Sequence, residues 1–81
     1  MGQRVAITLP SYEGECTAYL SFWYKDVGDE VEAGEDLLEY ETDKAAVTME
    51  APVSGRVAEI LVAEDEAVHP EMLVAYIETE D

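Results

Sequence analysis

Apolar and polar residues alternate along several short stretches of this chain, and no stretch of about ten residues or more shows a convincing helical period. Two such stretches, residues 37–42 and 45–52, flank the dipeptide Asp43-Lys44 near mid-chain. Each has the pattern of a half-buried strand, so the dipeptide is expected to form the tip of a tight hairpin. The side chains expected to face the core are Leu38, Tyr40 and Thr42 on the first strand and Val47, Met49 and Ala51 on the second.

The two halves of the chain repeat one pattern. A shift of 37 residues places Glu41-Thr42 on Glu78-Thr79 and aligns apolar residues with apolar residues. The aligned pairs are Leu20 with Val57, Trp23 with Ile60, Tyr24 with Leu61, Val31 with Val68, Leu37 with Val74, and Tyr40 with Ile77. A weaker echo, at a shift of 42 residues, matches Val5, Ile7 and Pro10 to Val47, Met49 and Pro52. Two similar halves of short strands predict an all-β fold, a flattened barrel or sandwich with quasi-twofold symmetry.

The repeat also predicts the place of Lys44 in that fold. Lys44 aligns with Asp81, the last residue, so the quasi-twofold axis carries the lysine tip onto the C-terminus. The two are therefore expected at opposite ends of the domain, with the ammonium group pointing into water. Most single lysines in turns are solvent-exposed residues with no specific function. A functional role for Lys44 is favoured only by the motifs along the rest of the chain.

Length and charge narrow the classes of function. Residues 1–81 are expected to form one small domain with one core. Four basic residues against twenty acidic ones give a net charge of −16, which would repel phosphate backbones and anionic lipids. Nucleic acid and membrane are therefore not expected as partners. The absence of an apolar span or secretory signal, and a single cysteine, Cys16, indicate the cytoplasm, or the mitochondrial matrix in a eukaryote.

No group of residues suggests catalysis or metal binding. The chain has one histidine, His69, which precedes a proline in an expected turn, and it has no nucleophile elbow or Cys/His metal spacing. Trp23 aligns with Ile60 and is expected to pack at least partly against the domain. Lys25, the other lysine, is at no hairpin tip and is not expected to be modified.

Six motifs occur in order along essentially the whole chain: ITLPS at 7–11, WYKDVGD at 23–29, VEAG at 31–34, ETDKA at 41–45, EAPVSG at 50–55 and VAYIE at 74–78. Together, with Gly34 ten residues before Lys44 and Gly55 eleven after it, they resemble the lipoyl (biotinyl/lipoyl attachment) domain of the acyltransferase component of 2-oxo acid dehydrogenase complexes. That resemblance implies a barrel-sandwich hybrid of two four-stranded antiparallel sheets, with the modified lysine on a hairpin and the termini at the far end.

The resemblance also implies a function. Lys44 would carry lipoic acid through an amide, with Asp43 and Ala45 beside it for recognition, and with no non-covalent cofactor. The lipoyl arm would visit a thiamin-diphosphate-dependent 2-oxo acid decarboxylase, the acyltransferase core and dihydrolipoyl dehydrogenase, after attachment by a lipoate ligase or lipoyl transferase. The domain itself would be a non-catalytic carrier within an acyltransferase subunit.

Two other functions remain open at this point. A biotin carboxyl carrier shares the fold, although biotin acceptors typically have methionine on both sides of the lysine, where this chain has Asp43 and Ala45. An unmodified barrel-sandwich used as an interaction module is the second. The chain departs from the family pattern at the loop Tyr12-Glu13-Gly14-Glu15, which is about one residue shorter than in many members. The sequence therefore does not identify which 2-oxo acid dehydrogenase complex the domain would serve.

Overall fold

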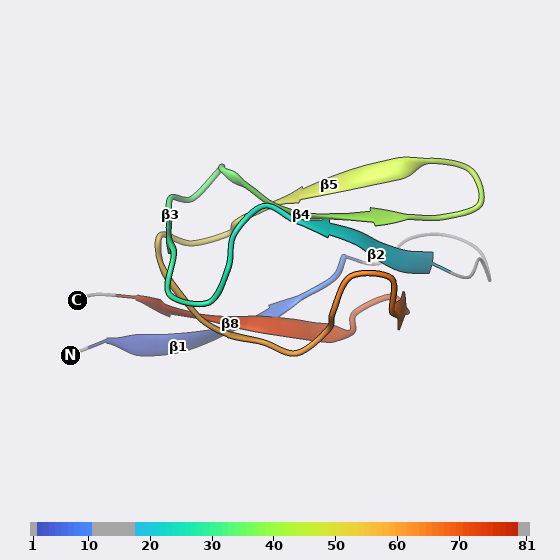
Figure 1. Ribbon diagram of the computed structural model, residues 1–81. Coiled ribbons are helices and arrows are strands. Elements are labelled where there is room, and N and C mark those ends of the chain that lie inside the picture. The colour runs from blue at the N-terminus through green and yellow to red at the C-terminus, as the bar shows by residue number, and fades with distance from the viewer. Residues whose placement is uncertain (1, 11–17, 80–81) are drawn as a thin grey trace.

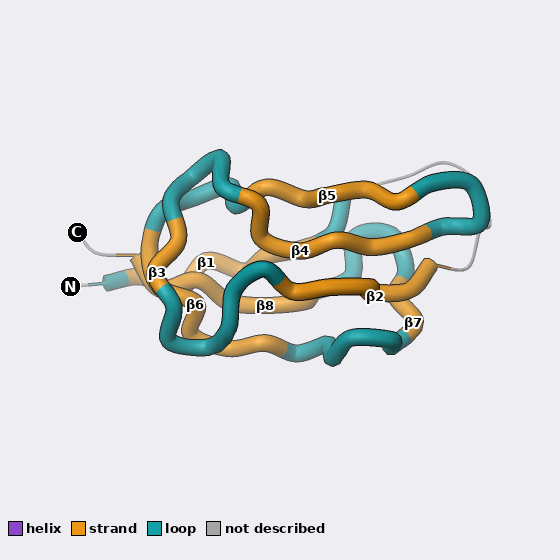
Figure 2. Tube along the Cα trace, turned by 45° about the horizontal axis from the view of Figure 1, so that its top comes forward, coloured by secondary structure: helices purple, strands orange, loops and turns teal. Residues whose placement is uncertain are grey.

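The computed structural model describes residues 2–10 and 18–79, and within those ranges it contains strands and turns but no helix (Figures 1 and 2). The strands are β1 (Gln3–Thr8), β2 (Ala18–Trp23), β3 (Glu30–Val31), β4 (Asp36–Glu41), β5 (Ala46–Glu50), β6 (Gly55–Ile60), β7 (Ala67–Val68) and β8 (Leu73–Thr79). They form two four-stranded antiparallel sheets, β1-β8-β6-β3 and β5-β4-β2-β7, here called the terminal sheet and the hairpin sheet. The expected all-β fold is confirmed.

One apolar core lies between the two sheets. Alternation along each strand produces it: in β2, Ala18 and Leu20 are fully buried while Tyr19 between them is half exposed. Trp23 is only 9% exposed, and its indole Nε1–H donates to the carbonyl oxygen of Val62 at 2.8 Å. The packed position expected for Trp23 is confirmed, with its one polar atom paired.

The strands repeat as the sequence predicts. β2, β3 and β4 begin 37 residues before β6, β7 and β8, and β1 is the counterpart of β5. The counterparts occupy the same places in the two sheets, because the order β1-β8-β6-β3 becomes β5-β4-β2-β7 when each strand is replaced by its partner. Even the irregularities match, since the pairing shifts between Leu20 and Phe22 in one sheet and between Val57 and Glu59 in the other. The quasi-twofold relation is therefore a property of the backbone.

Two turns bind the halves to each other. The N–H of Gly28, after β2, donates to the carbonyl of Val57 in β6 at 2.8 Å, and the N–H of Val57 donates to the carbonyl of Asp29 at 2.9 Å. The counterpart bonds run from Asp65 N–H to the Leu20 oxygen, 2.7 Å, and from Leu20 N–H to the Glu66 oxygen, 2.9 Å. Each half thus supplies the turn that completes the hydrogen bonding of a strand in the other half.

Among residues 2–10 and 18–79, four take up a left-handed backbone, and they too are related by the repeat. Gly28 and Gly34 have φ of 96° and 93°, while Asp65 and Glu71, 37 residues later, have φ of 72° and 63°. The turn conformation is therefore kept in the second half without glycine. Because a side chain at positive φ is unfavourable by about 1 kcal/mol, the second half carries a cost that the first half avoids.

Val47 departs from the expectation that it joins the core. It pairs with the buried Tyr40 on the inner side of the hairpin sheet, but its side chain is 38% exposed, whereas Met49 is partly buried and Ala51 is buried. The reason is the place of β5, which is the edge strand of its sheet and has a neighbouring strand on one side only. Alternation identified the face of Val47 correctly but not how far that face is covered.

The hairpin lies far from the start of β1 and the end of β8; Asp81, which the repeat aligns with Lys44, is outside the described residues. The molecule is elongated, 40 × 20 × 18 Å, with the β4–β5 turn at one end of its long axis (Figure 1). The start of β1 and the end of β8 pair with each other at the opposite end, where Gln3 faces Thr79.

Gly34→Ala tests the requirement for a left-handed backbone at this turn. A Cβ at Gly34 would meet nothing within 4 Å, so a loss of stability can come only from the φ of 93°. We expect the free energy of unfolding to fall by about 1–2 kcal/mol in urea denaturation. Gly34→Asn is the control, because asparagine tolerates positive φ better and should lose less. Equal losses for the two variants would contradict this account.

Candidate functional site

The turn between β4 and β5 holds the residues that the sequence singles out. Glu41 and Ala46 form the last cross-strand pair, and Asp43 and Lys44 are the two central residues of the turn between Thr42 and Ala45. Neither central residue has a positive φ. The turn therefore accepts ordinary side chains at its tip and needs no glycine there.

The hydroxyl of Thr42 holds this turn in shape. Its Oγ1 accepts the backbone N–H of Lys44 and that of Ala45, both at 3.2 Å, and donates to the carbonyl of Ala45, also at 3.2 Å. The N–H of Thr42 donates to the same carbonyl at 2.9 Å. A side-chain oxygen thus stands in for part of the backbone ladder, which fixes the residues on both sides of the lysine stem.

This role of Thr42 was missed in the sequence, where the residue counted only as part of a core-facing row. It is half-buried, with the hydroxyl turned to the backbone of the turn. A threonine two residues before the turn lysine is a usable signal, because Ser and Thr hydroxyls commonly accept backbone N–H groups within a turn.

The two lysines of the chain differ in their surroundings. Lys44 is exposed, and among the salt bridges of residues 2–10 and 18–79 none involves it. The Lys25 ammonium lies 3.2 Å from Glu35 Oε2 with its side chain only 23% exposed. The pKa of the Glu35 carboxyl is lowered, first by the N–H of Glu32, which donates to it, and then by Lys25. Lys25 is therefore engaged in structure, while Lys44 projects into solvent.

The structure brings Asp43, Lys44 and Ala45 together at one exposed tip, as the sequence predicts. The described ranges contain no group of three or more His, Cys, Asp or Glu side chains placed to hold a metal ion. They also contain no helix long and apolar enough to cross a membrane. His69 is exposed, and its Nδ1 lies 3.0 Å from the carbonyl of the next residue, Pro70. The loop at residues 12–15 and Cys16 lie outside the described residues.

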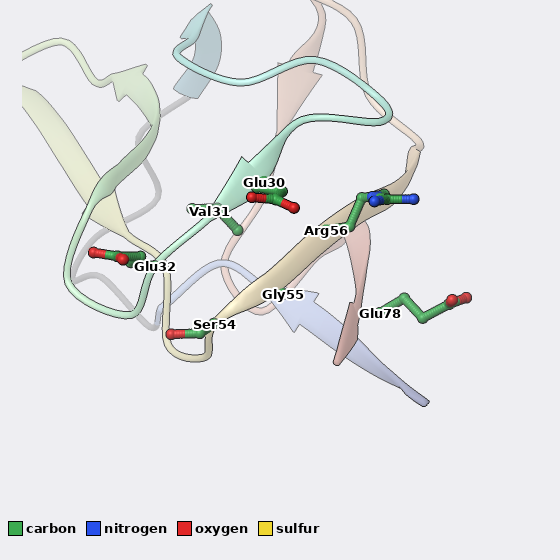
Figure 3. A pocket seen from close by; sticks show the side chains of 7 residues that line it. All are labelled: Glu30, Val31, Glu32, Ser54, Gly55, Arg56 and Glu78. Atoms are coloured by element: carbon green, nitrogen blue, oxygen red, sulfur yellow. The ribbon is translucent and has the colours of Figure 1, made fainter. Parts of the chain in front are cut away.

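A hollow of about 300 Å³ lies away from the hairpin, in the terminal sheet (Figure 3). Glu30, Arg56 and Glu78 follow one another across β3, β6 and β8 in this region. The full lining is Glu30, Val31, Glu32, Ser54, Gly55, Arg56 and Glu78. This lining includes no residue of the lysine turn.

Comparison with known proteins identifies the family. Residues 5–77 match the model of the biotin/lipoyl attachment family, which carries the description "Biotin-requiring enzyme". The chain belongs to this family. The match spans the domain from β1 to β8, including the hairpin, so the turn lies within the shared pattern.

The curated relatives of this attachment domain are acyltransferase components. The chain is 46% identical over 55 residues, 68% of its length, to the dihydrolipoyllysine-residue acetyltransferase component of the pyruvate dehydrogenase complex of Corynebacterium glutamicum, of which it covers 8%. It is 35% identical to the succinyltransferase component of the 2-oxoglutarate dehydrogenase complex of Bartonella vinsonii, over 82% of the chain and 16% of the relative.

A third relative aligns with almost all of the attachment domain. The acetyltransferase component of the acetoin cleaving system of Pseudomonas putida is 32% identical over 95% of the chain, which covers 21% of the relative. The domain thus spans a small fraction of the length of each of these three relatives, which bear the names of different complexes.

Thr42→Val tests the hydroxyl that holds the turn. The variant keeps the branched shape but leaves the N–H groups of Lys44 and Ala45 without their acceptor, so we expect unfolding free energy to fall by about 1 kcal/mol. Amide exchange of those two residues should become faster. Thr48→Val, on the exposed side of β5, is the matched control and should change neither quantity measurably. Unchanged exchange at Lys44 in Thr42→Val would rule out the proposed role.

The contrast between the lysines predicts their reactivity. With a limiting amount of an N-hydroxysuccinimide acetate at neutral pH, Lys44 should be acetylated before Lys25, because the latter is half-buried in an ion pair. Peptide mass mapping at partial reaction measures the order. Equal labelling of the two lysines would contradict the exposure described here.

Proposed function

We propose that this domain is a lipoyl carrier and that lipoic acid is attached to Lys44 through an amide. The observation that supports it most is the exposed lysine at the end of a hairpin, held by Thr42 and without a salt bridge among the described residues. Membership of the attachment family and relatives named for dihydrolipoyllysine support the choice of lipoate.

Attachment would join the lipoate carboxyl to the lysine Nζ and remove one positive charge, so the formal net charge would pass from −16 to −17. The lysine stem and the prosthetic group together form a long arm. With its root at the far end of the molecule from the start of β1 and the end of β8, the arm can reach partner active sites while the rest of the domain stays clear. A tether of this kind raises the local concentration of the carried group.

Asp43 and Ala45 supply recognition in this proposal. Both are exposed beside Lys44. One has a carboxylate and the other only a methyl group, so an enzyme that binds the turn would contact only small side chains around the lysine. Methionine on both sides, as biotin acceptors typically have, would surround the stem with two long apolar side chains. The flanking pair therefore favours lipoate over biotin.

The partners follow from the family and remain part of the proposal. They are a thiamin-diphosphate-dependent 2-oxo acid decarboxylase, an acyltransferase core, dihydrolipoyl dehydrogenase, and a lipoate ligase or lipoyl transferase. The domain, residues 1–81, carries acyl groups and electrons between them without catalysing a step, as one unit of an acyltransferase subunit in the cytoplasm or mitochondrial matrix. The arm supplies the redox and acyl chemistry; the domain presents it.

Incubation with lipoate ligase, ATP and lipoate tests the proposal directly. We expect the intact mass to rise by one lipoyl group, confined to Lys44, and Lys44→Arg to abolish the increase. Lys25→Arg is the control and should be modified normally. Because Lys44 is exposed, Lys44→Arg should change unfolding free energy by no more than about 0.5 kcal/mol.

A parallel incubation with biotin ligase and biotin discriminates the alternatives. Faster labelling by biotin ligase would make the domain a biotin carboxyl carrier. Refusal by both ligases, together with unmodified protein from the native host, would make it an interaction module.

A further inference from the structure

The internal repeat allows the outer face of one sheet to be compared with that of the other. On the terminal sheet, Arg4 of β1 forms a salt bridge of 3.4 Å with Glu59 of β6, and its guanidinium carbon lies 5.8 Å from the centre of the Tyr76 ring of β8. Glu59 and Tyr76 are direct cross-strand partners. A carboxylate and an aromatic ring, side by side on neighbouring strands, thus hold a guanidinium on this face.

The hairpin sheet has the same pair with the residues exchanged. Phe22 of β2 stands where the repeat puts Glu59, and Glu39 of β4 stands where it puts Tyr76. Phe22 and Glu39 are likewise direct cross-strand partners. The position of Arg4 is taken by Ala46, an exposed residue whose side chain cannot reach either of them. The ring and the carboxylate are present here, and the guanidinium is not.

The Phe22 ring and the Glu39 carboxylate are both positioned for contact with another protein. Phe22 is 46% exposed and packs its ring edge-on against Tyr24, itself 42% exposed, with centroids 4.9 Å apart. Glu39 is held in place by Ser21, whose hydroxyl donates to Glu39 Oε2 or to its backbone carbonyl, each 3.1 Å away. A carboxylate that is already oriented loses little freedom on binding.

Charge favours a cation on this face. The four strands of the hairpin sheet contain four acidic residues and no basic one, whereas the terminal sheet contains three acidic and two basic residues. The acidic residues of the hairpin sheet are Asp36, Glu39, Glu41 and Glu50. A net charge of −16 opposes self-association, so the complementary surface belongs to another, basic protein.

We propose that the Phe22–Glu39 pair is a docking site for an arginine side chain of a partner protein. The guanidinium would lie against the Phe22 ring and donate to the Glu39 carboxylate, repeating between two proteins the contact that Arg4 makes within this one. Ala46 leaves the place open and is two residues from Lys44, so the bound partner would sit beside the lysine tip. Arginine suits this site better than lysine because its planar group can stack and donate at once.

Titration of the ¹⁵N-labelled chain with hexa-arginine amide and with hexa-lysine amide tests the site. The chain is used with Lys44 unmodified, so the result does not depend on the proposed lipoylation. At physiological salt we expect hexa-arginine to bind at least about threefold more tightly, with the largest amide shifts at Phe22, Glu39 and Ala46. Phe22→Leu and Glu39→Gln should each remove that preference. Equal affinity for the two peptides, or shifts spread evenly over the acidic surface, would overturn the proposal in favour of bulk charge attraction.

Placing an arginine of the chain itself at the site gives a matched pair of variants. A46R restores the residue that the repeat supplies at Arg4 and should abolish the preference for hexa-arginine. A33R adds the same charge in the exposed turn between β3 and β4 and should retain it. Equal weakening by both variants would refute a specific site. Dimerisation of the wild-type chain that A46R abolishes would also refute it, since the occupant would then be a second copy. If A46R did not fold, the Phe22 and Glu39 variants would decide alone.

Discussion

Reciprocal backbone hydrogen bonds through Leu20 and Val57 are the constraint on which the rest of this structure depends. Each of these buried residues sits in a strand of one sheet and exchanges two bonds with the turn that leaves the other. These backbone bonds fix the two sheets to each other in addition to the side chains that interdigitate in the core. These bonds tie β6 to the turn after β2 and β2 to the turn after β6. The hairpin lies at the opposite end of the long axis from the start of β1 and the end of β8.

That arrangement separates the lysine of the proposed function from the contacts that hold the domain together. The buried Trp23 indole N–H is paired with the Val62 carbonyl, and Lys25 is tied to Glu35. Lys44 contributes to none of these contacts among the described residues. The turn that bears it is ordered by Thr42, so the stem starts from a defined place although its amine is free to move. Order at the root and freedom at the tip are both needed by a carrier.

The outer faces of the two sheets are equivalent by the repeat but carry different side chains. On the outer face of the terminal sheet, Arg4 forms a salt bridge with Glu59. At the equivalent position of the hairpin sheet, near the lysine turn, stands Ala46, which has no charged group. At the left-handed turns the backbone agrees and the residues differ, since Asp65 and Glu71 have the positive φ of Gly28 and Gly34 although neither is glycine. Between the two halves, backbone geometry agrees more closely than the side chains do, and the hydrogen bonds that join the halves are made by the backbone.

The sequence by itself determined the all-β class, the repeat and the identity of the tip residues, because alternation, turn residues and spacing are local or periodic properties that the order of residues records. Only the tertiary structure decided how far Val47 is covered, since β5 is an edge strand, and that the Thr42 hydroxyl caps the turn. It alone placed Arg4 over Tyr76 and paired Phe22 with Glu39, where the repeat has Ala46 in place of that arginine. Such facts depend on which strands become neighbours and which lie at an edge, and these follow from the closure of both sheets around a common core.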